Sequence, residues 1–464
     1  MTLFLETIQT NRTHKLRPYQ QAAVDAALSK KQGIIVAPTG SGKSHIIAEI
    51  VNGIPGKTLI LQPTKEILES NYDKITALGF TDATIYSASC GIKQIGKATY
   101  ATIGSIIEKL ELFSDIKALI VDECHYVNAK GGMYETLIKR LAPEYLIGLT
   151  ATPYRLHTTS MGSTIRLLTR TRPRMFTQFL HITECSDLID QGFLRQPEFI
   201  VSDPGDTSIL RPNSTGAEYT DDSISNYLKA IDDTERIAIA AKKALEVGQR
   251  HILIFTPYLE NASAAVERLR SYGMTADMVS GDMNRRDREK KLADFKSGRI
   301  QAMANVRVLT TGYDFPALDT IISARPTMSL SLYYQIIGRG VRPFPDKNQV
   351  VVYDLVDNFS KFGDPMQMKL KPDHTGNYVL FSGEGKRLTG RSDRDYTTPA
   401  QIDNETIPFG KYKDKKVSEA DLGYLVWCSK TFEPGKWKDI FTAEVKRRKI
   451  EEHKGVTSES SYRM

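Results

Sequence analysis

The chain has 464 residues, which is too long for a single hydrophobic core and predicts two or three domains. Its composition, 41% apolar and 25% charged, is typical of a soluble globular protein, and no apolar run approaches the roughly 18–20 residues that cross a membrane. The net charge of +7 favours a polyanionic partner without identifying it.

Two absences in the sequence indicate the cellular compartment. Met1–Arg12 lacks the basic segment, apolar run and small-residue cleavage site of a secretory signal. The cysteines form no CxxC pair and predict neither a structural zinc site nor a disulfide framework. We therefore expect a cytoplasmic protein with scattered cysteines at positions Cys90, Cys124, Cys185 and Cys428.

A glycine-bearing segment, Ala37–Ser44 (APTGSGKS), follows the apolar run Gly33–Val36 and precedes the helix-like run Ser44–Val51. A further helix is expected upstream, at Leu16–Leu28. The order of buried strand, glycine turn and helix start is typical of a phosphate-binding loop. Because Ala37 replaces the first glycine of the usual pattern, a chance glycine-rich turn is the alternative.

The loop carries the residue types that phosphate binding needs. Gly40 and Gly42 allow backbone N–H groups to turn toward anionic oxygens. Lys43 is expected to reach the β- and γ-phosphates of a nucleotide, and the hydroxyl of Ser44 to bind Mg²⁺. The candidate nucleotide-binding residues of the loop are Thr39, Gly40, Ser41, Gly42, Lys43 and Ser44.

Short apolar strands alternate with helical segments after the loop. This alternation predicts an α/β fold with a parallel sheet covered by helices, in which ligands gather at the carboxyl ends of the strands. A helix is expected at Ile67–Ala77, and strands at Thr58–Leu61, Ala83–Tyr86, Ala98–Thr102, Ala118–Val121 and Leu146–Leu149.

Two polar strings stand at the ends of these strands. Asp122 and Glu123 open the string DECH directly after an apolar strand. A carboxylate there can hold Mg²⁺, and its neighbour can polarise an attacking water, so we assign the metal to Asp122 and the water to Glu123. The string Thr150–Pro153 (TATP) follows the last of the strands.

The phosphate loop, DECH and TATP, in this order, resemble the first RecA-like domain of superfamily 2 helicases and translocases. The resemblance implies two tandem RecA-like domains. It implies that Arg17 and Gln20 contact the nucleotide, with Gln20 reading adenine. It also implies that His125, Thr150 and Thr152 couple hydrolysis to domain motion.

A second alternating block runs from His251–Phe255 to Val350–Asp354 and predicts a second α/β domain. Leu309–Pro316 (LTTGYDFP) resembles the family's fifth motif, which contacts nucleic acid and ribose. By this resemblance Gly312 and Asp314 are expected at the nucleotide.

Gln335–Pro343 (QIIGRGVRP) resembles the family's sixth motif, QxxGRxxR. Arg339 and Arg342 are three apart on a predicted helix, so both can face one cleft. Guanidinium groups stabilise the charge that develops on the γ-phosphate as its bond breaks. We therefore predict arginine fingers, supported by Gln335, against the alternative of a basic surface turn.

Nucleic acid is the expected partner. Tyr154–Thr183 contains five arginines and no acidic residue, which fits contact with a phosphate backbone or a solvated hinge. Together with the resemblance, this predicts nucleic-acid contacts at Pro63, Thr64, Lys65, Thr102, Gly104, Ser105, Arg155, Thr256, Thr310, Thr311 and Trp427.

The last block, from Pro408 to Trp427, is aromatic and basic and resembles a small module at the end of some X-type exonucleases. Both tryptophans of the chain, Trp427 and Trp437, lie in this region. They are expected in a small core, with base stacking as the alternative.

The predicted organisation has six parts. They are RecA-like domain 1 at 1–155, a connector (basic, then acidic, and partly loop) at 156–235, RecA-like domain 2 at 236–364, a linker or loop-rich insert at 365–400, an accessory DNA-interaction module at 401–450 and a disordered tail at 451–464.

The sequence predicts an enzyme that uses ATP and Mg²⁺ to move on DNA. The compact size and the string TATPYR are similar to phage branch-migration helicases of the UvsW type, which implies forks and four-way (Holliday) junctions as substrates in the host cytoplasm. We expect a monomer or weak oligomer. The alternatives are a restriction-type or remodelling motor on duplex DNA or RNA, and a clamp that binds ATP without hydrolysis.

Overall fold

The computed structural model divides the chain into two compact units. The larger unit comprises Met1–Arg155, Arg166–Ser214 and Glu218–Thr389, and the smaller Leu156–Ile165, Thr215–Ala217 and Gly390–Met464. The structure describes residues 15–127, 132–159, 162–171, 174–306, 308–309, 315–345, 347, 349–373, 376–389, 406–407, 409–432, 437, 440–442 and 444–445.

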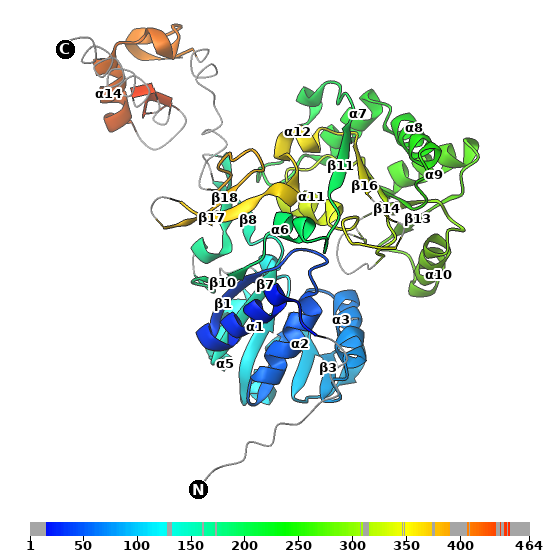
Figure 1. Ribbon diagram of the computed structural model, residues 1–464. Helices are drawn as coiled ribbons and strands as arrows, with labels where there is room; N and C mark the ends of the chain where they lie inside the picture. Colours follow the sequence, from blue (N-terminus) through cyan, green and yellow to red (C-terminus); the bar gives the residue numbers. More distant parts are fainter. Residues whose placement is uncertain are drawn as a thin grey trace, which may run out of the picture. The chain divides into compact units, whose positions relative to one another are not determined.

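The first domain is built on an eight-stranded sheet in the order β10-β1-β7-β6-β2-β5-β3-β4 (Figure 1). All neighbouring strands are parallel except the pair β3 and β4. The strands are β1 (Gln32–Val36), β2 (Lys57–Leu61), β3 (Ala83–Ser87), β4 (Ile92–Lys93), β5 (Ala98–Ala101), β6 (Ile116–Val121), β7 (Tyr145–Thr150) and β10 (Phe179–Ile182).

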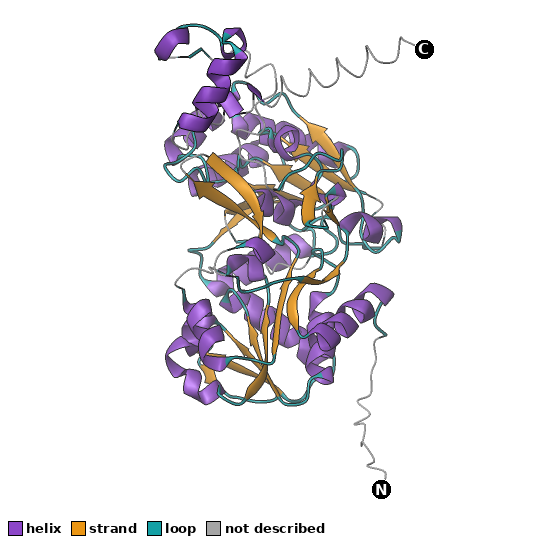
Figure 2. Ribbon diagram, turned by 90° about the vertical axis from the view of Figure 1, so that its left-hand side faces the viewer, coloured by secondary structure: helices purple, strands orange, loops and turns teal. Residues whose placement is uncertain are grey.

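Helices cover this sheet because its central strands are apolar on both faces and must be buried on both sides. Figure 2 shows them in purple around the orange strands. The helical segments are α1 (Pro18–Lys30), α2 (Lys43–Gly53), α3 (Lys65–Ala77), α4 (Ile103–Ile106), α5 (Met133–Leu141) and the 3₁₀ turns η1 (Ile107–Phe113), η2 (Cys124–Tyr126) and η3 (Leu168–Arg170).

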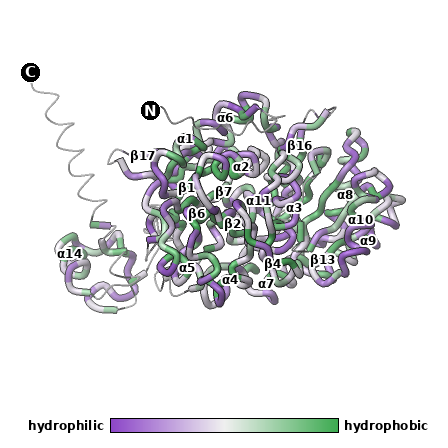
Figure 3. The backbone as a smooth tube through the Cα atoms, turned by 90° about the horizontal axis from the view of Figure 1, so that it is seen from below, coloured by the Kyte–Doolittle hydropathy of each residue, from purple (hydrophilic) through white to green (hydrophobic). Residues whose placement is uncertain are grey.

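The second domain has a six-stranded, wholly parallel sheet in the order β11-β16-β15-β12-β14-β13. Figure 3 shows that helices such as α9 and α10 carry many hydrophilic residues at its edge. The strands are β11 (Pro197–Val201), β12 (Ile252–Phe255), β13 (Ala276–Ser280), β14 (Ala302–Val306), β15 (Thr320–Ser323) and β16 (Val350–Asp354). The helical segments are α6 (Cys185–Asp190), η4 (Thr207–Ile209), α7 (Asp221–Ala230), α8 (Asp233–Glu246), α9 (Leu259–Ser271), α10 (Arg285–Lys296), α11 (Leu330–Ile337), α12 (Asn358–Phe362) and η5 (Pro365–Gln367). The predicted class, two parallel α/β sheets flanked by helices, is confirmed.

The interval 156–235, expected as a connector, contributes structure to both domains. β10 pairs with β1 at the edge of the first sheet, and β11 pairs with β16 at the edge of the second. Both strands are only four or five residues long, so neither produces a long apolar run in the sequence. The helical stretch in this region is divided into α7 and α8, because Asp232 adopts a left-handed φ of 50° between them and caps α8.

The interval 365–400, expected as a linker, contains an antiparallel hairpin of β17 (Lys369–Pro372) and β18 (Tyr378–Phe381). The ring of Tyr378 lies 5.1 Å from that of Phe179 on β10, so the hairpin packs against the first sheet. Among the described helices, none is long and apolar enough to cross a bilayer.

The smaller unit has its own core, in which Leu425, Cys428 and Phe441 are fully buried. Trp437 packs against this core, whereas Trp427 is 55% exposed. Its described elements are η7 (Gly410–Tyr412), η8 (Val417–Glu419) and α14 (Leu422–Thr431). The strands β8 (Tyr154–Thr159) and β9 (Gly162–Leu167) pair with each other, and Leu156–Ile165 is assigned to this unit.

The contact between β17 and α6 makes stability depend on pH. Glu184 accepts a hydrogen bond from the backbone N of Leu370 (2.9 Å), and burial raises the pKa of its carboxyl to about 7. The folded state therefore holds this proton to higher pH than the unfolded state, and stability falls as pH rises from about 4.5 to 7.

Glu184→Gln keeps the acceptor and cannot ionise. We expect it to match the wild type at pH 5 and to exceed it at pH 8 by about 1–2 kcal/mol in denaturant unfolding. Glu198→Gln, at an exposed position on β11, is the matched control. A stability difference that does not change with pH would contradict this account.

Candidate nucleotide-binding site

The predicted motifs meet at one edge of the first sheet. The strands β1, β7, β6 and β2 are neighbours and parallel, so their carboxyl ends lie side by side. The loop Ala37–Gly42, the strings Thr150–Pro153 and Asp122–His125, and Pro63–Lys65 follow these four strands in that order. The sheet topology thus gathers residues that are more than a hundred positions apart in the sequence.

The phosphate loop turns through two left-handed glycines, Gly40 (φ 85°) and Gly42 (φ 82°), before α2 begins at Lys43. A Cβ atom at Gly42 would lie 2.5 Å from Nε2 of Gln20. Nε2 of Gln20 and the hydroxyl of Tyr19 each donate to the carbonyl oxygen of Ser41 at 2.8 Å. Helix α1 therefore supports the loop from beneath, and Gly42 permits this close approach.

Lys43 lies between the loop and the DECH string. Its Nζ is 3.2 Å from Oε1 of Glu123 and donates to the carbonyl oxygen of Ala37 (3.4 Å). Glu123 has a left-handed φ of 45°, which is a strained conformation for a residue with a side chain. The backbone thus holds the Glu123 carboxylate against the lysine.

Ser44 and Asp122 are joined by a residue that the sequence analysis missed, Asn71 of α3. Its Oδ1 accepts from the hydroxyl of Ser44 (3.1 Å), and its Nδ2 donates to Oδ2 of Asp122 (2.9 Å). Nδ2 also donates to the side-chain oxygen of Gln62 (3.2 Å). No motif marks Asn71, because its role depends on α3 packing beside the loop.

The two carboxyl groups have opposite pKa shifts. Burial, reinforced by the charge of Glu123, raises the pKa of Asp122 to about 6. Burial alone would also raise the pKa of Glu123, but Lys43 and His125 lower it below its ordinary value. Glu123 is therefore the group held ionised, by the charge of Lys43 and the hydrogen bond with His125.

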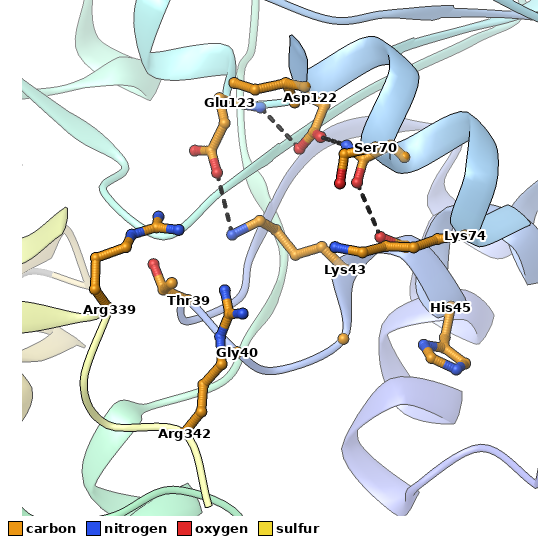
Figure 4. Close-up of a pocket in the computed structure, with 14 residues that line it drawn as sticks. Thr39, Gly40, Lys43, His45, Ser70, Lys74, Asp122, Glu123, Arg339 and Arg342 are labelled. Carbon is orange, nitrogen blue, oxygen red and sulfur yellow. Dashed lines mark hydrogen bonds and ion pairs between the residues drawn. The ribbon is translucent and has the colours of Figure 1, made fainter. Parts of the chain in front are cut away.

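Two arginines from the second domain enter the same site (Figure 4). Arg339 and Arg342 line a cavity of about 240 Å³ together with Lys43, Asp122 and Glu123. The approach is close, because a Cβ atom at Gly40 would lie 3.1 Å from Cγ of Arg342. The predicted meeting of these two arginines with the phosphate loop is present in the structure.

A buried chain of polar side chains joins the domains behind this cavity. Nδ1 of His125 is 2.8 Å from Oγ1 of Thr150 and 3.3 Å from Oε2 of Glu123. Nε2 of His125 is 3.0 Å from Nε2 of Gln335 on α11. Oγ1 of Thr150 also accepts from the backbone N of Thr152 (3.0 Å). His125 therefore connects the DECH string, the TATP string and the second domain.

Lys347 is a second residue that the sequence analysis missed. It is 6% exposed, and its ammonium group donates to three carbonyl oxygens, those of Pro316, Gly340 and Arg342. The backbone N of Arg195 donates to the carbonyl oxygen of Val341 (2.7 Å) on the same loop. The backbone that carries Arg342 is thus fixed from two sides.

Three of the predicted site residues, Arg17, Gln20 and Arg155, do not line the cavity. Arg17 is stacked on the ring of Phe193 (4.2 Å), and neither Arg17 nor Gln20 lines the cavity. Arg155 donates to the backbone carbonyl oxygens of His125 and Val127, which places its guanidinium behind the DECH string.

Two groups of the predicted nucleic-acid contacts lie after the neighbouring strands β2 and β5. Thr64 caps α3 and Lys65 donates to the carbonyl oxygen of Ser89 (2.7 Å), while Pro63 is half-buried beside them. Thr102 and Ser105 are hydrogen-bonded (2.9 Å), and Gly104 between them is exposed at the end of β5, which is the neighbour of β2.

Thr256 is 1% exposed at the end of β12, between β14 and β15, and its contact with nucleic acid stays a prediction. Trp427 belongs to the smaller unit. Thr310, Thr311, Gly312 and Asp314 lie outside the described residues.

The cavity fits a magnesium nucleotide. Four cationic side chains line it, which suits a triphosphate, and they are those of Lys43, Lys74, Arg339 and Arg342. Ser44 and Asp122 offer the hard oxygen ligands that Mg²⁺ requires. The two side chains are close together, because both hydrogen-bond to the amide group of Asn71.

Comparisons with known proteins agree with this geometry. Residues 13–155 match the family model of the type III restriction enzyme res subunit, and residues 236–343 match the helicase conserved C-terminal domain. A Haloarcula marismortui protein named as the DNA 3'-5' helicase Rad25 is 26% identical over 75% of this chain and 54% of its own length. A 51.5 kDa protein of a Lactococcus phage is 24% identical over 72% of this chain and 67% of its own.

Among solved structures, a fragment of an HsdR subunit of a type I restriction enzyme from Vibrio vulnificus has a TM-score of 0.57, 21% identity, and coverage of 81% of this chain and 70% of that one. This likeness concerns the fold. The fold and the two family models together define the class of protein. It is an ATP-dependent enzyme with two RecA-like domains. The chain belongs to superfamily 2 of the helicases and translocases, whose cofactor is ATP with Mg²⁺. It spans about half to two thirds of the length of the curated relatives that it matches.

Loss of the Lys347 ammonium should loosen the backbone that carries Arg342. We expect Lys347→Met to lower kcat for ATP hydrolysis about tenfold, or about 1.4 kcal/mol, because the arginine is then poorly placed. Affinity for ADP should be unchanged, because the phosphate loop belongs to the other domain.

Lys361→Met is the matched control, because this lysine donates to the hydroxyl of Tyr219 and the carbonyl oxygen of Thr327, away from the arginine loop. Steady-state ATPase assays and ADP titrations of both variants measure the effect. Equal losses of kcat and ADP affinity would contradict a positioning role for Lys347.

Proposed function

We propose that the protein is an ATP-driven motor that moves on DNA. The observation that carries the proposal is the shared cavity, in which Arg339 and Arg342 of one domain stand beside Lys43 and Glu123 of the other. A site assembled from two domains changes when the domains move, so nucleotide chemistry and domain motion are linked. A clamp that only binds ATP has no need of these arginines.

Within this site each residue has a distinct role. The backbone of Thr39–Ser44 and the Lys43 ammonium would bind the phosphates, and Ser44 and Asp122 would hold Mg²⁺, which would supply positive charge against the phosphates. Glu123 accepts a proton from the attacking water. Arg339 and Arg342 then stabilise the developing charge, and because they belong to the other domain they act as fingers only when the cleft is closed.

Nucleotide recognition rests on Arg17 and Gln20 for adenine, and on Gly312 and Asp314 for ribose. Gln20 already donates a hydrogen bond to Ser41 of the phosphate loop, so a contact between Gln20 and a bound base would act directly on the conformation of the loop. His125 and Gln335 would transmit the state of the cleft, because their hydrogen bond exists only while the domains are together.

Several observations favour DNA as the track. Pro63–Lys65 and Thr102–Ser105 end neighbouring strands, so they present a common edge to a strand of nucleic acid. One relative carries the name of a DNA 3'-5' helicase, and another comes from a phage. The remaining contacts proposed are Thr310 and Thr311, with Arg155 holding the DECH string from behind.

Two substrates are proposed for the motor. The resemblance of the string TATPYR to phage branch-migration helicases is the basis for proposing forks and four-way junctions, which would be unwound or migrated in recombination and repair. The likeness to restriction subunits favours translocation along duplex DNA without strand separation. A monomer or weak oligomer in the cytoplasm fits both.

The experiment compares ATPase stimulation and strand displacement on single-stranded DNA, duplex, fork, four-way junction and RNA. We expect one of the DNA substrates to give the strongest response. A branch-migration enzyme would displace strands of forks and four-way junctions, whereas a restriction-type motor would be stimulated by duplex DNA without displacing a strand.

Lys43→Ala should remove ATP turnover while retaining DNA binding, because the lysine is placed to contact phosphate and not the DNA. Glu123→Gln should bind ATP and stall. Strongest stimulation by RNA, or turnover by Lys43→Ala, would overturn the proposal.

A further inference from the structure

The smaller unit exposes an aromatic surface that the motor does not use. We define it by Tyr412, Tyr424 and Trp427. The rings of Tyr412 and Tyr424 are 4.9 Å apart, and those of Tyr424 and Trp427 are 6.2 Å apart and inclined by 35°. The three rings thus form one continuous row.

The row is held in place by the fold of this unit. Helix α14 buries Leu425 and Cys428 in the small core and leaves Trp427 55% exposed. Asp421 caps the helix at Tyr424 (2.8 Å) and accepts a hydrogen bond from the hydroxyl of Tyr412 (2.5 Å). The aromatic surface is therefore positioned by specific contacts, although its indole has not been taken into the core.

A close approach of backbone to side chain fixes the same surface. Gly410 has a left-handed φ of 72°, and a Cβ atom there would lie 2.6 Å from the hydroxyl of Tyr424. A side chain at this position would strain the backbone and press on the tyrosine hydroxyl, so Gly410 allows Tyr424 to lie where it does.

The segment that carries these rings also carries exposed lysines. Nζ of Lys411 lies 5.3 Å from the ring centre of Tyr412, and Lys430 is exposed one turn along α14 from Trp427. The segment 409–432 contains five lysines and three acidic residues, and the other exposed lysines are Lys413, Lys415 and Lys416. Flat aromatic faces between cations match alternating bases and phosphates.

We propose that this aromatic surface binds single-stranded DNA, with a base stacked on Trp427 and the phosphates near the surrounding lysines. A duplex hides the faces of its bases, so only an unpaired strand can use the exposed indole. Binding here requires no ATP, and the surface would hold a displaced strand while the motor moves. The proposal extends the proposed function but does not depend on turnover.

Intrinsic fluorescence tests the proposal in the full chain without nucleotide. Both tryptophans of the protein, Trp427 and Trp437, lie outside the motor domains, so quenching by oligothymidylate reports on this unit alone. We expect strong quenching in the wild type and its loss in Trp427→Ala, with affinity reduced about tenfold. Trp427→Phe should restore most of the affinity, because a ring remains for stacking.

Two further variants separate stacking from charge. Lys430→Gln should reduce the slope of log affinity against log salt by about 0.7, whereas Trp427→Ala should leave that slope unchanged. Trp437→Phe is the control, because Trp437 packs against Phe409 (5.3 Å) and should contribute little to quenching. Thermal melting verifies that each variant is folded.

Three results would overturn the proposal. Oligothymidylate could bind, by anisotropy, without quenching the wild-type fluorescence. Folded Trp427→Ala could retain full affinity, which would point to a protein partner for this surface. A duplex of equal length could quench as strongly as the single strand. None of these outcomes would affect the assignment of the ATP site, which is tested separately by Lys43→Ala.

Discussion

The architecture depends on cationic side chains of one domain being held against the phosphate loop of the other. Arg342 passes so near Gly40, and Gly338 so near Thr39, that a Cβ atom on either glycine would approach its neighbour to 3.1 Å or 3.0 Å. At these two points the backbone of one half packs directly against the other, beside the cavity that both halves line. In this closed arrangement four cationic side chains line the cleft, two from each domain, so separation of the domains would remove Arg339 and Arg342 from it.

Buried hydrogen bonds make the closed arrangement specific. Glu123, His125 and Gln335 form a chain in which each member is largely shielded from solvent, so an unpaired member would carry a desolvation cost of about 1–3 kcal/mol. Separation of the domains exposes His125 and Gln335 to water, which removes that cost. These hydrogen bonds thus favour the closed arrangement in which all three side chains are paired over closed arrangements in which one is not, and add little net stability.

Much of the site could be predicted from the sequence because its parts follow strands. The loop, DECH and TATP each stand at the end of an apolar run, and parallel pairing brings such ends together. Asn71 and Lys347 could not be predicted, because each acts through carbonyl or amide contacts that exist only after distant elements pack. The short edge strands β10 and β11 were missed for a related reason, since tertiary pairing and not local pattern defines them.

The central claim is that the two halves of the site act as one unit, and a double-mutant cycle on His125 and Gln335 tests it most directly. DNA-stimulated kcat is measured for the wild type, His125→Ala, Gln335→Ala and the double variant. We predict that the double variant is no slower than the slower single variant, because either change already breaks the connection. Losses that multiply would show that the two residues act independently, and would contradict the account.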